Sequence, residues 1–248
     1  MLYAMDASTG AVDWTITAGL DINTPVAVTA GVAYFASTEQ LYAADAATGE
    51  VLWTAPVNAN LSGPAISGGV LYIGGWDYKL HAFNATTGAE LWSASTGSTI
   101  YSTPAVSGGI VYVGSDDDNI YAFDAATGQE VWHFTTGDWV NSSPAVSGGV
   151  VYAAWQDHNV YALDASTGHL LWAVTTGDWI NLASPVVANG IVYIGSNDNN
   201  MYAIDGSTGQ VLWTYQTGGD VNSTPAVADG VVYIGSFNQK FYAFGLPA

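Results

Sequence analysis

Short apolar runs alternate with polar turns along the whole chain, and no run has a helical period. Around Pro144 the runs are SPAV (143–146), VVYAAW (150–155), VYALD (160–164) and HLLWAV (169–174), with three or four residues between each and the next. Valine, isoleucine, tyrosine and tryptophan dominate these runs, as they do in half-buried strands. The pattern therefore predicts four short β-strands in this stretch, joined by tight turns.

This four-strand unit recurs along the chain, and two markers show its period. One is the motif Asp/Asn-x-x-Thr-Gly-x-x-x-Trp, whose tryptophans are Trp14, Trp53, Trp92, Trp132, Trp172 and Trp213. The other is a proline after a small residue, at Pro25, Pro64, Pro104, Pro144, Pro185 and Pro225. Successive markers lie 39 to 41 residues apart. Such a period is typical of repeat proteins, and four antiparallel strands per repeat predict an all-β chain folded as a β-propeller.

The turns of each repeat have a consistent chemistry. Gly-Gly, Asn-Gly or Asp-Gly separates most of the first and second strands, and these pairs suit a two-residue hairpin turn with positive φ. In the Trp motif we expect the Asp or Asn side chain to hydrogen-bond turn amides while Gly takes the left-handed position. We expect the Trp to bury its ring between neighbouring blades and donate its indole N–H. The six motif tryptophans are therefore assigned a structural role.

The strand signals do not divide evenly into blades. The third-strand signal occurs seven times, from LYAMD (2–6) to FYAFG (241–245), whereas each of the other three occurs six times. The simplest closure places the spare strand AVDWTI (11–16) at the edge of the last blade, which gives a single six-bladed propeller domain over residues 1–248. The alternative is a fragment of a seven- or eight-bladed ring. Unpaired ends also allow strand exchange or homo-oligomeric association between copies.

Charge narrows the range of partners. The chain has 2 basic and 21 acidic residues and a net charge of −19, yet only 9% of its residues are charged, against about 25% in average proteins. Such a surface repels phosphate backbones and anionic membranes, so nucleic acid is not expected as a partner.

No apolar run is long enough to span a membrane, and the first residues, MLYAMDASTG, contain no signal-peptide pattern. Without cysteine, there is no disulfide, thiolate metal site or cysteine nucleophile.

The loops indicate which face of the propeller carries the functional site. Fourth-to-first and second-to-third loops share one face, and in this chain they vary, whereas the loops of the opposite face are nearly uniform. All four tryptophans outside the motif lie in or next to the variable loops. The candidate ligand-binding residues, able to stack on or hydrogen-bond a sugar or planar ligand, are Trp139, Trp179, Asp138, Asp178, Asn141, Asn181, Tyr101, Trp76 and Trp155. The alternative is that DWVN (138–141) and DWIN (178–181) only pack between blades.

The sequence supports a metal site less strongly than it supports a ligand-binding face. A ring of carboxylates from Asp138, Asp178 and Asp220 would suit a cation such as calcium. The stretch SDDDN (115–119) lacks the ligand spacing of an EF-hand and is interpreted as a polar hairpin tip. The four histidines share no metal-ligand spacing.

The motif AxDxxTGxxxW after a VYALD-type strand resembles the tryptophan-docking motif of PQQ-enzyme-like repeat propellers, and the resemblance covers essentially the whole chain. That family includes quinoprotein dehydrogenases and non-enzymatic propellers such as an outer-membrane assembly lipoprotein, so the fold alone does not select a function. The dehydrogenase site, as the resemblance implies it, uses a vicinal cysteine pair, a cationic Arg or Lys, and acidic and Asn residues around calcium. This chain has no cysteine and no arginine, and no position matches the catalytic motif.

We therefore expect a non-catalytic binding or scaffold module with a glycan or protein partner. No cofactor is predicted; calcium is the one ion considered, and PQQ, with three carboxylates, is disfavoured by the charge of −19. The alternatives are a quinoprotein-like enzyme or a fragment of one, and a structural repeat module of a larger cell-surface protein. Low lysine content and four Asn-x-Ser/Thr sequons favour an extracellular, periplasmic or cell-surface location.

Overall fold

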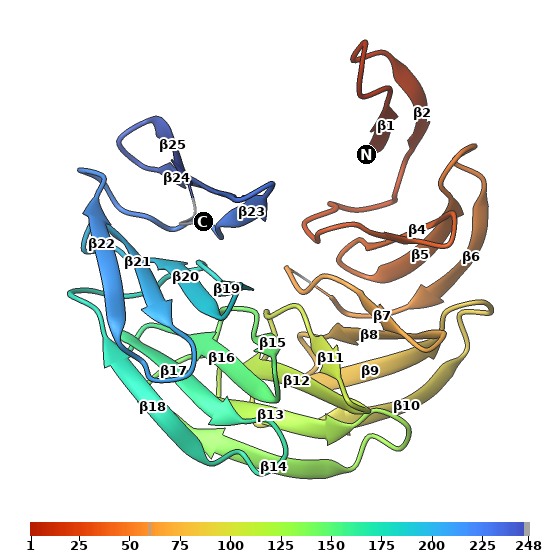
Figure 1. The fold of residues 1–248 in the computed structure, drawn as a ribbon. Helices are drawn as coiled ribbons and strands as arrows, with labels where there is room; N and C mark the ends of the chain where they lie inside the picture. The colour runs from red at the N-terminus through yellow and green to blue at the C-terminus, as the bar shows by residue number, and fades with distance from the viewer. Residues whose placement is uncertain (60, 246–248) are drawn as a thin grey trace. The chain divides into compact units, whose positions relative to one another are not determined.

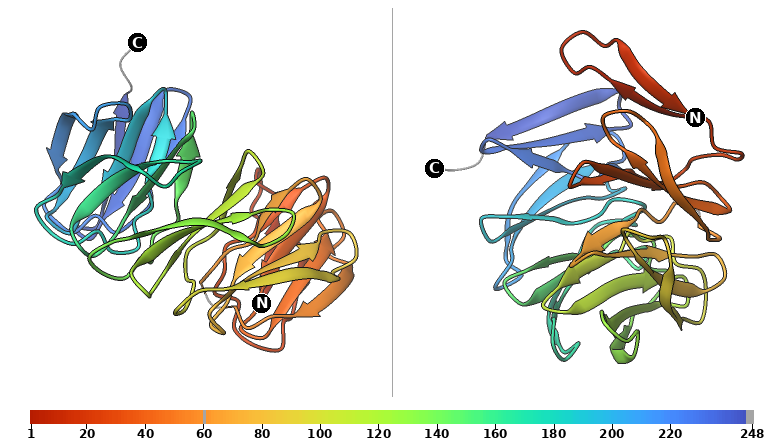
Figure 2. Two further views of the ribbon diagram at one scale, coloured as in Figure 1. Left: turned by 90° about the horizontal axis from the view of Figure 1, so that it is seen from below. Right: turned by 90° about the vertical axis from the view of Figure 1, so that its right-hand side faces the viewer.

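The structure is a computed structural model that describes residues 1–59 and 61–245 (Figure 1). The described residues form 25 β-strands and no helix, and so contain no segment with the helical length and apolar character needed to cross a bilayer. Five sheets have four strands, one has three and one has two. Within each sheet the strands follow one another in chain order, and their ribbons run side by side in both further views (Figure 2). The prediction of an all-β propeller built from four-stranded blades is confirmed.

The strands are grouped by their position in the repeat. First strands are β3 (Ala27–Thr29), β7 (Ala65–Ser67), β11 (Ala105–Ser107), β15 (Ala145–Ser147), β19 (Val186–Ala188) and β23 (Ala226–Ala228). Second strands are β4 (Val32–Ala36), β8 (Val70–Gly74), β12 (Ile110–Ser115), β16 (Val150–Ala154), β20 (Ile191–Gly195) and β24 (Val231–Ser236). Third strands are β1 (Leu2–Met5), β5 (Gln40–Asp45), β9 (Lys79–Asn84), β13 (Asn119–Asp124), β17 (Asn159–Asp164), β21 (Asn200–Asp205) and β25 (Lys240–Gly245). Fourth strands are β2 (Val12–Ile16), β6 (Val51–Pro56), β10 (Glu90–Ser95), β14 (Glu130–Thr135), β18 (Leu170–Thr175) and β22 (Val211–Gln216).

The chain divides into two compact units. The first comprises residues 1–111 with 123–129, and the second residues 112–122 with 130–248. Each is described below by itself. The assignment of one propeller domain to residues 1–248 stays a prediction.

Turn chemistry sets the register of each sheet. The β15–β16 turn places Gly148 at φ 59° and Gly149 at φ 79°, and the β19–β20 turn uses Asn189 at φ 52° with Gly190 at φ 76°. Two successive positive φ values define the two-residue turn whose twist matches that of antiparallel strands. In the third-to-fourth turn the carboxylate of Asp164 accepts the backbone N–H of Thr167 at 2.9 Å. Side-chain hydrogen bonds from Ser166 and Thr167 help to lower the pKa of Asp164 to about 2.

The middle strands are apolar on both sides because a sheet packs against each side. In the first unit, Leu41 and Ala43 of β5 share a buried cluster with Leu71 and Ile73 of β8. The alternate residue Tyr42 packs with Phe35 and Ile16 in a second cluster. Since successive side chains of a strand point to opposite faces, one strand contributes to two sheet-to-sheet contacts. This explains why the second and third strands appear as near-continuous apolar runs.

The motif tryptophans join each fourth strand to the sheet that follows it. Trp53 donates its indole N–H to the carbonyl of Ala85 at 3.0 Å, and a Cβ built at Gly88 would lie 2.6 Å from the same ring. The carbonyl and the glycine thus belong to one turn of the next sheet, which accounts for the fixed spacing of the motif. The other indole N–H groups with an acceptor at this repeat position, all at 2.9–3.1 Å, are those of Trp14, Trp92, Trp132 and Trp172.

The two ends of the described chain form incomplete sheets. Strand β2 pairs with β1, with Ala4 opposite Trp14, and β25 pairs with β24 in a sheet of three strands. The structure thus differs from the predicted closure, in which residues 11–16 extend the last blade. The local hairpin forms because the turn Asp6–Gly10 joins the two strands with a short loop, which costs little closure entropy. These sheets do not fix the number of blades.

Candidate functional site

Two tryptophans project from identically built loops of the second unit. Trp139 follows β14 and is 53% exposed, and Trp179 follows β18 and is 51% exposed. In each loop the preceding aspartate accepts the backbone N–H of the tryptophan, at 2.9 Å for Asp138 and 2.8 Å for Asp178. A threonine hydroxyl also donates to the carbonyl of each aspartate. The loop backbone is therefore fixed while about half of each indole surface stays open to a ligand.

The residue after each tryptophan anchors the loop. Val140 is 0% exposed and Ile180 is 1% exposed, so burial of these side chains holds the loops in place. Their N–H groups donate to the carbonyls of Ser115 and Trp155 at 3.2 and 3.3 Å. The structure thus divides the alternatives for DWVN and DWIN by position: the aliphatic residue packs inward, and the tryptophan points outward.

The asparagines of these loops lie one position further on. Asn141 and Asn181 are both half-buried. The Oδ1 atom of Asn141 has no hydrogen-bond partner among the described residues. That atom is buried, so it is not open to a ligand in this structure, and the exposed part of the loop is the indole of Trp139.

Trp155 does not belong with these residues, which corrects the expectation from the sequence. It is 1% exposed and stacks on Tyr161 with ring centroids 4.6 Å apart. The repeats on either side carry Ser115 and Ser196 at this position, and both are also buried. The position directly after or at the end of the second strand points into the molecule whichever residue occupies it, so this ring offers no surface to a ligand.

The first unit has its own aromatic pair, an exposed Trp76 and a half-buried Tyr101. Trp76 is 40% exposed and meets Tyr101 edge to face, with ring centroids 6.3 Å apart. The N–H of Trp76 donates to the carbonyl of Asn58 at 2.7 Å, which joins a second-to-third loop to a fourth-to-first loop. Both predicted residues therefore lie together on the variable loops of this unit.

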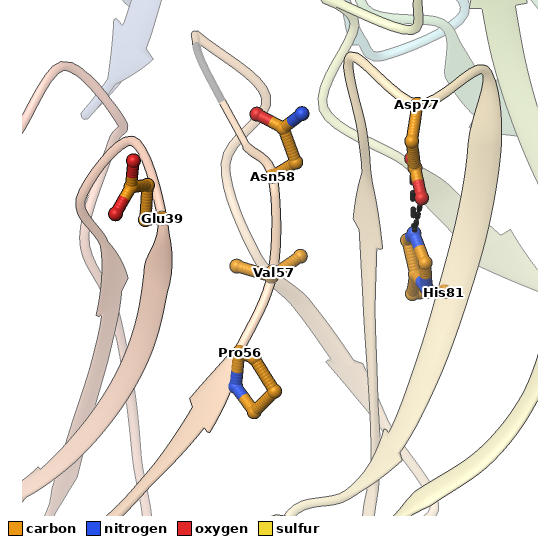
Figure 3. Close-up of a pocket in the computed structure, with 6 residues that line it drawn as sticks. All are labelled: Glu39, Pro56, Val57, Asn58, Asp77 and His81. Atoms are coloured by element: carbon orange, nitrogen blue, oxygen red, sulfur yellow. Dashed lines mark hydrogen bonds and ion pairs between the residues drawn. The ribbon is translucent and has the colours of Figure 1, made fainter.

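A hollow of about 420 Å³ opens beside that loop contact (Figure 3). It is lined by Glu39, Pro56, Val57, Asn58, Asp77 and His81. Figure 3 shows Asn58 and Asp77 at the loop end of the hollow, with Val57 and Pro56 further down. Its volume lies within the range of small-molecule sites. Of its lining residues, none was predicted as a ligand contact from the sequence.

His81 is held between two carboxylates. Its Nε2 atom lies 3.1 Å from both carboxylate oxygens of Asp77, and its Nδ1 atom lies 2.9 Å from Oε1 of Glu90. Other repeats have tyrosine here, as where Tyr161 donates to Asp157 at 2.6 Å. The signal in the sequence was the single histidine in LHAFN (80–84), where every other third strand has tyrosine. His81 and Asp77 are thus engaged with each other, and Glu39 and Asn58 are the other polar residues that line the hollow.

The acidic loops are largely occupied by their own hydrogen bonds. Asp117 accepts the hydroxyl of Tyr121 at 2.8 Å and the N–H of Asn119 at 3.2 Å, as suits a capped hairpin tip. Burial, followed by the charges of Asp117 and Asp118, raises the pKa of Asp116 to about 6. Within residues 1–59 and 61–245 no three acidic or histidine side chains are grouped so that they could hold a metal ion. The cation at Asp138, Asp178 and Asp220 stays a prediction to which this geometry adds no support.

Comparison with known proteins identifies the family to which this chain belongs. A family model described as outer membrane protein assembly factor BamB matches residues 1–102 and 77–247, which together cover almost the whole chain. The chain belongs to this family. The recognition of a PQQ-like repeat propeller is thereby confirmed. No curated protein matches the chain.

Solved structures support the BamB-like fold. The crystal structure of BamB from Moraxella catarrhalis matches with a TM-score of 0.84 and 20% identity, over 98% of this chain and 78% of that one. The computationally designed Ika8 protein matches with a TM-score of 0.85 and 20% identity, over 96% of this chain and 75% of that one. At this identity the likeness shows the fold, and membership of the BamB family does not by itself assign residues to a function.

Proposed function

We propose that this BamB-family propeller is a non-catalytic scaffold that binds a protein partner through its variable loops, with Trp139 and Trp179 as the central contacts. The observation that carries the proposal is the presentation of two half-exposed indoles by fixed loops of the same construction. Tryptophan is among the residues that most often dominate the free energy of a protein interface. A loop backbone that is held in place before binding loses little conformational entropy when a partner covers it.

The surroundings of the indoles favour a protein over a glycan. Leu182, three residues after Trp179, is 56% exposed and extends the apolar surface. One carboxylate oxygen of Asp138 and one of Asp178 accept the backbone N–H of the following tryptophan, which leaves the second oxygen of each as an acceptor for a partner's N–H or O–H group. With a net charge of −19, the chain favours a partner with a neutral or basic contact surface. The family description, an outer membrane protein assembly factor, also supports a protein partner.

The proposal includes no redox cofactor. The chain lacks the cysteine pair and the arginine that the resemblance to quinoprotein dehydrogenases would require. We also place the protein outside the cytoplasm, in the periplasm or at the cell surface, on the basis of its family and its lysine-poor composition. Accessibility of the folded protein to protease added to intact cells, compared with cells whose outer envelope is opened, tests that location.

Binding is tested with the double variant Trp139→Ser/Trp179→Ser and a matched control, Leu171→Ser. Leu171 lies on β18 in the same unit and is 52% exposed, so the control removes a similar exposed apolar side chain away from the loops. Partners captured from an envelope extract are identified, produced in pure form and titrated against each variant, and a glycan array is read in parallel. We expect the double variant to weaken partner binding by at least about 30-fold, the loss of one central interface residue of about 2 kcal/mol.

The control is expected to bind the partner as the unaltered chain does. Equal binding by the double variant would overturn the assignment of the indoles. Binding to a glycan that the double variant abolishes, with no protein captured, would replace the protein partner by a sugar.

A further inference from the structure

Four of the fourth-to-first loops share one framework, but only two of them carry an aspartate followed by a tryptophan. In each of the four, a threonine hydroxyl donates to the carbonyl two residues further on, at 2.7–2.9 Å. Each also buries an aliphatic side chain that is at most 1% exposed. The threonines are Thr96, Thr136, Thr176 and Thr217, and the aliphatic residues are Ile100, Val140, Ile180 and Val221.

The Asp-Trp pair is not needed to build this framework. The other two loops have Ser98 with Thr99, or Gly219 with Asp220, in its place, and they form the same hydroxyl-to-carbonyl bond. The pair itself occurs at residues 138–139 and 178–179, in two consecutive repeats. Because the loop folds without the pair, we assign the two side chains to recognition rather than to the fold.

The acidic residues around these two loops fall into two groups. Asp157 and Asp198, each on the sheet that follows, hold the loops by accepting a glycine N–H and a tyrosine hydroxyl. Asp138 and Asp178 each use one oxygen for the N–H of the following tryptophan, and no hydrogen bond to a described residue engages the other oxygen. The carboxylate oxygens that stay available to a partner therefore lie beside the indoles.

The chain has no arginine to pair with these carboxylates. Its two lysines are Lys79, in the first unit, and Lys240, on β25, so neither belongs to the two loops. The loops are joined to each other, since the N–H of Ser143 donates to Oγ of Ser184 at 2.9 Å. Two half-exposed indoles, each with an unneutralised carboxylate, are thus carried by adjacent loops of one unit.

We propose that each Asp-Trp pair binds the guanidinium group of an arginine, so that the protein partner presents two arginines to these loops. This inference rests on the proposed function and specifies the chemistry of the partner's contact surface. A guanidinium is planar and weakly hydrated, so it can stack on an indole while its N–H groups donate to the free carboxylate oxygen. A lysine ammonium is compact and strongly hydrated, and it has no flat face to stack.

Short peptides and isothermal titration calorimetry test the proposal. Each peptide is acetylated and amidated at its ends and carries two arginines, separated by roughly two to ten Gly/Ser residues, which span up to about 30 Å. Matched peptides carry citrulline, which has the shape of arginine without its charge. The buffer contains about 50 mM NaCl, so that charge attraction is only partly screened.

Three double variants separate the contributions to binding. Asp138→Asn/Asp178→Asn removes both charges and keeps an oxygen for the tryptophan N–H, and Trp139→Leu/Trp179→Leu keeps an apolar side chain without the ring. Glu130→Gln/Asp229→Asn is the control with the same change of charge. Glu130 begins β14 and Asp229 lies in the β23–β24 turn, both on the uniform-loop face of the same unit. Melting curves confirm that the three variants fold.

We expect at least one diarginine peptide to bind the unaltered chain, and the matched citrulline peptide to bind at least about 10-fold more weakly, the loss of one charge-assisted hydrogen bond. The Asp→Asn variant is expected to weaken the diarginine peptide by a similar factor. We expect the Trp→Leu variant to weaken it by at least about 5-fold, from two lost cation–π contacts, and the control to bind as the unaltered chain does.

Four results would each overturn arginine recognition: no binding by any diarginine peptide, equal binding of the citrulline peptide, equal binding by the Asp→Asn variant, or an equal loss in the control. The protein captured from the envelope extract is titrated against the same variants. If that protein loses affinity for Trp139→Ser/Trp179→Ser but not for the Asp→Asn variant, the proposed function stands and arginine recognition fails. If the diarginine peptides behave as expected but no captured protein depends on the indoles, arginine recognition stands and the proposed function fails.

Discussion

A single glycine in each repeat determines how closely a tryptophan can pack. The Trp53 ring lies where a side chain on Gly88 would begin, and the neighbouring carbonyl of Ala85 accepts its N–H. A tryptophan with both contacts is fixed in position and in orientation, so the motif requires the glycine for two reasons: its φ of +72° and the absence of a Cβ.

Gly88→Ala and Gly10→Ala separate these two requirements. Both glycines have φ +72°, so both substitutions introduce similar backbone strain, but only at Gly88 does the new methyl group meet a ring. We expect Gly88→Ala to lower the free energy of unfolding by about 1–3 kcal/mol more than Gly10→Ala does, the usual range for overpacking. Urea unfolding of the two variants measures the difference, and equal losses would show that the close ring contact has no energetic weight.

Asp116 gives a prediction for pH. Its pKa is raised to about 6 in the folded chain, mainly by burial, whereas an unfolded aspartate titrates near about 3.9. Between these values the folded state binds more protons than the unfolded state, so this residue makes stability fall as pH rises from about 4 to about 6. The repeat carries Asn197 at the same position, which makes Asp116→Asn a substitution that the fold already accommodates.

We therefore expect Asp116→Asn to raise the melting temperature at pH 7 and to leave it nearly unchanged at pH 4. Melts of both chains at the two pH values measure the effect. A variant that is less stable than the unaltered chain at pH 7 would contradict the burial of this carboxyl group as the cause of its pKa.

At the scale of strands, alternation of buried positions could be predicted from the sequence, and the ends of strands less well. The predicted runs 150–155, 160–164 and 169–174 correspond to β16, β17 and β18 to within one residue at each end. The predicted run 143–146 became β15 (Ala145–Ser147), because Pro144 has no N–H for the sheet and the strand begins after it. Trp155 ended the predicted strand 150–155 and was also counted with the variable loop that follows it, and the structure buries it directly after β16.

Burial within the strands sets the cost of truncating a side chain. Ile73 of β8 is 0% exposed, whereas Leu91 of β10 in the same unit is 52% exposed. We expect Ile73→Ala to lower the free energy of unfolding by about 2–4 kcal/mol, and Leu91→Ala by less than about 0.5 kcal/mol. Urea unfolding checks both values, and similar costs would mean that the buried side of β8 is not part of a packed sheet contact.

At the scale of the whole molecule, the sequence was sufficient to predict the propeller fold but not to locate the functional site. Six copies of one motif overdetermine the propeller, since each repeat independently predicts the same four strands. Function depends on loops that occur once. The sequence placed Trp139, Trp179 and Trp155 on the same variable face, yet the first two are half exposed and the third is buried. The hollow beside His81 needs residues from four separate segments, 39, 56–58, 77 and 81, which no local pattern connects.

We propose that this PQQ-like propeller works as a scaffold without a redox cofactor, and one thermal melt tests that proposal most directly. The purified chain is melted with EDTA, with calcium, and with calcium plus PQQ. A ligand of the folded state at 100 times its dissociation constant adds about 2.7 kcal/mol of stability, which for a chain of this length is roughly 5–10 °C. We predict the same midpoint in all three conditions. A higher midpoint only with calcium plus PQQ would contradict this proposal and support the alternative of a quinoprotein-like enzyme.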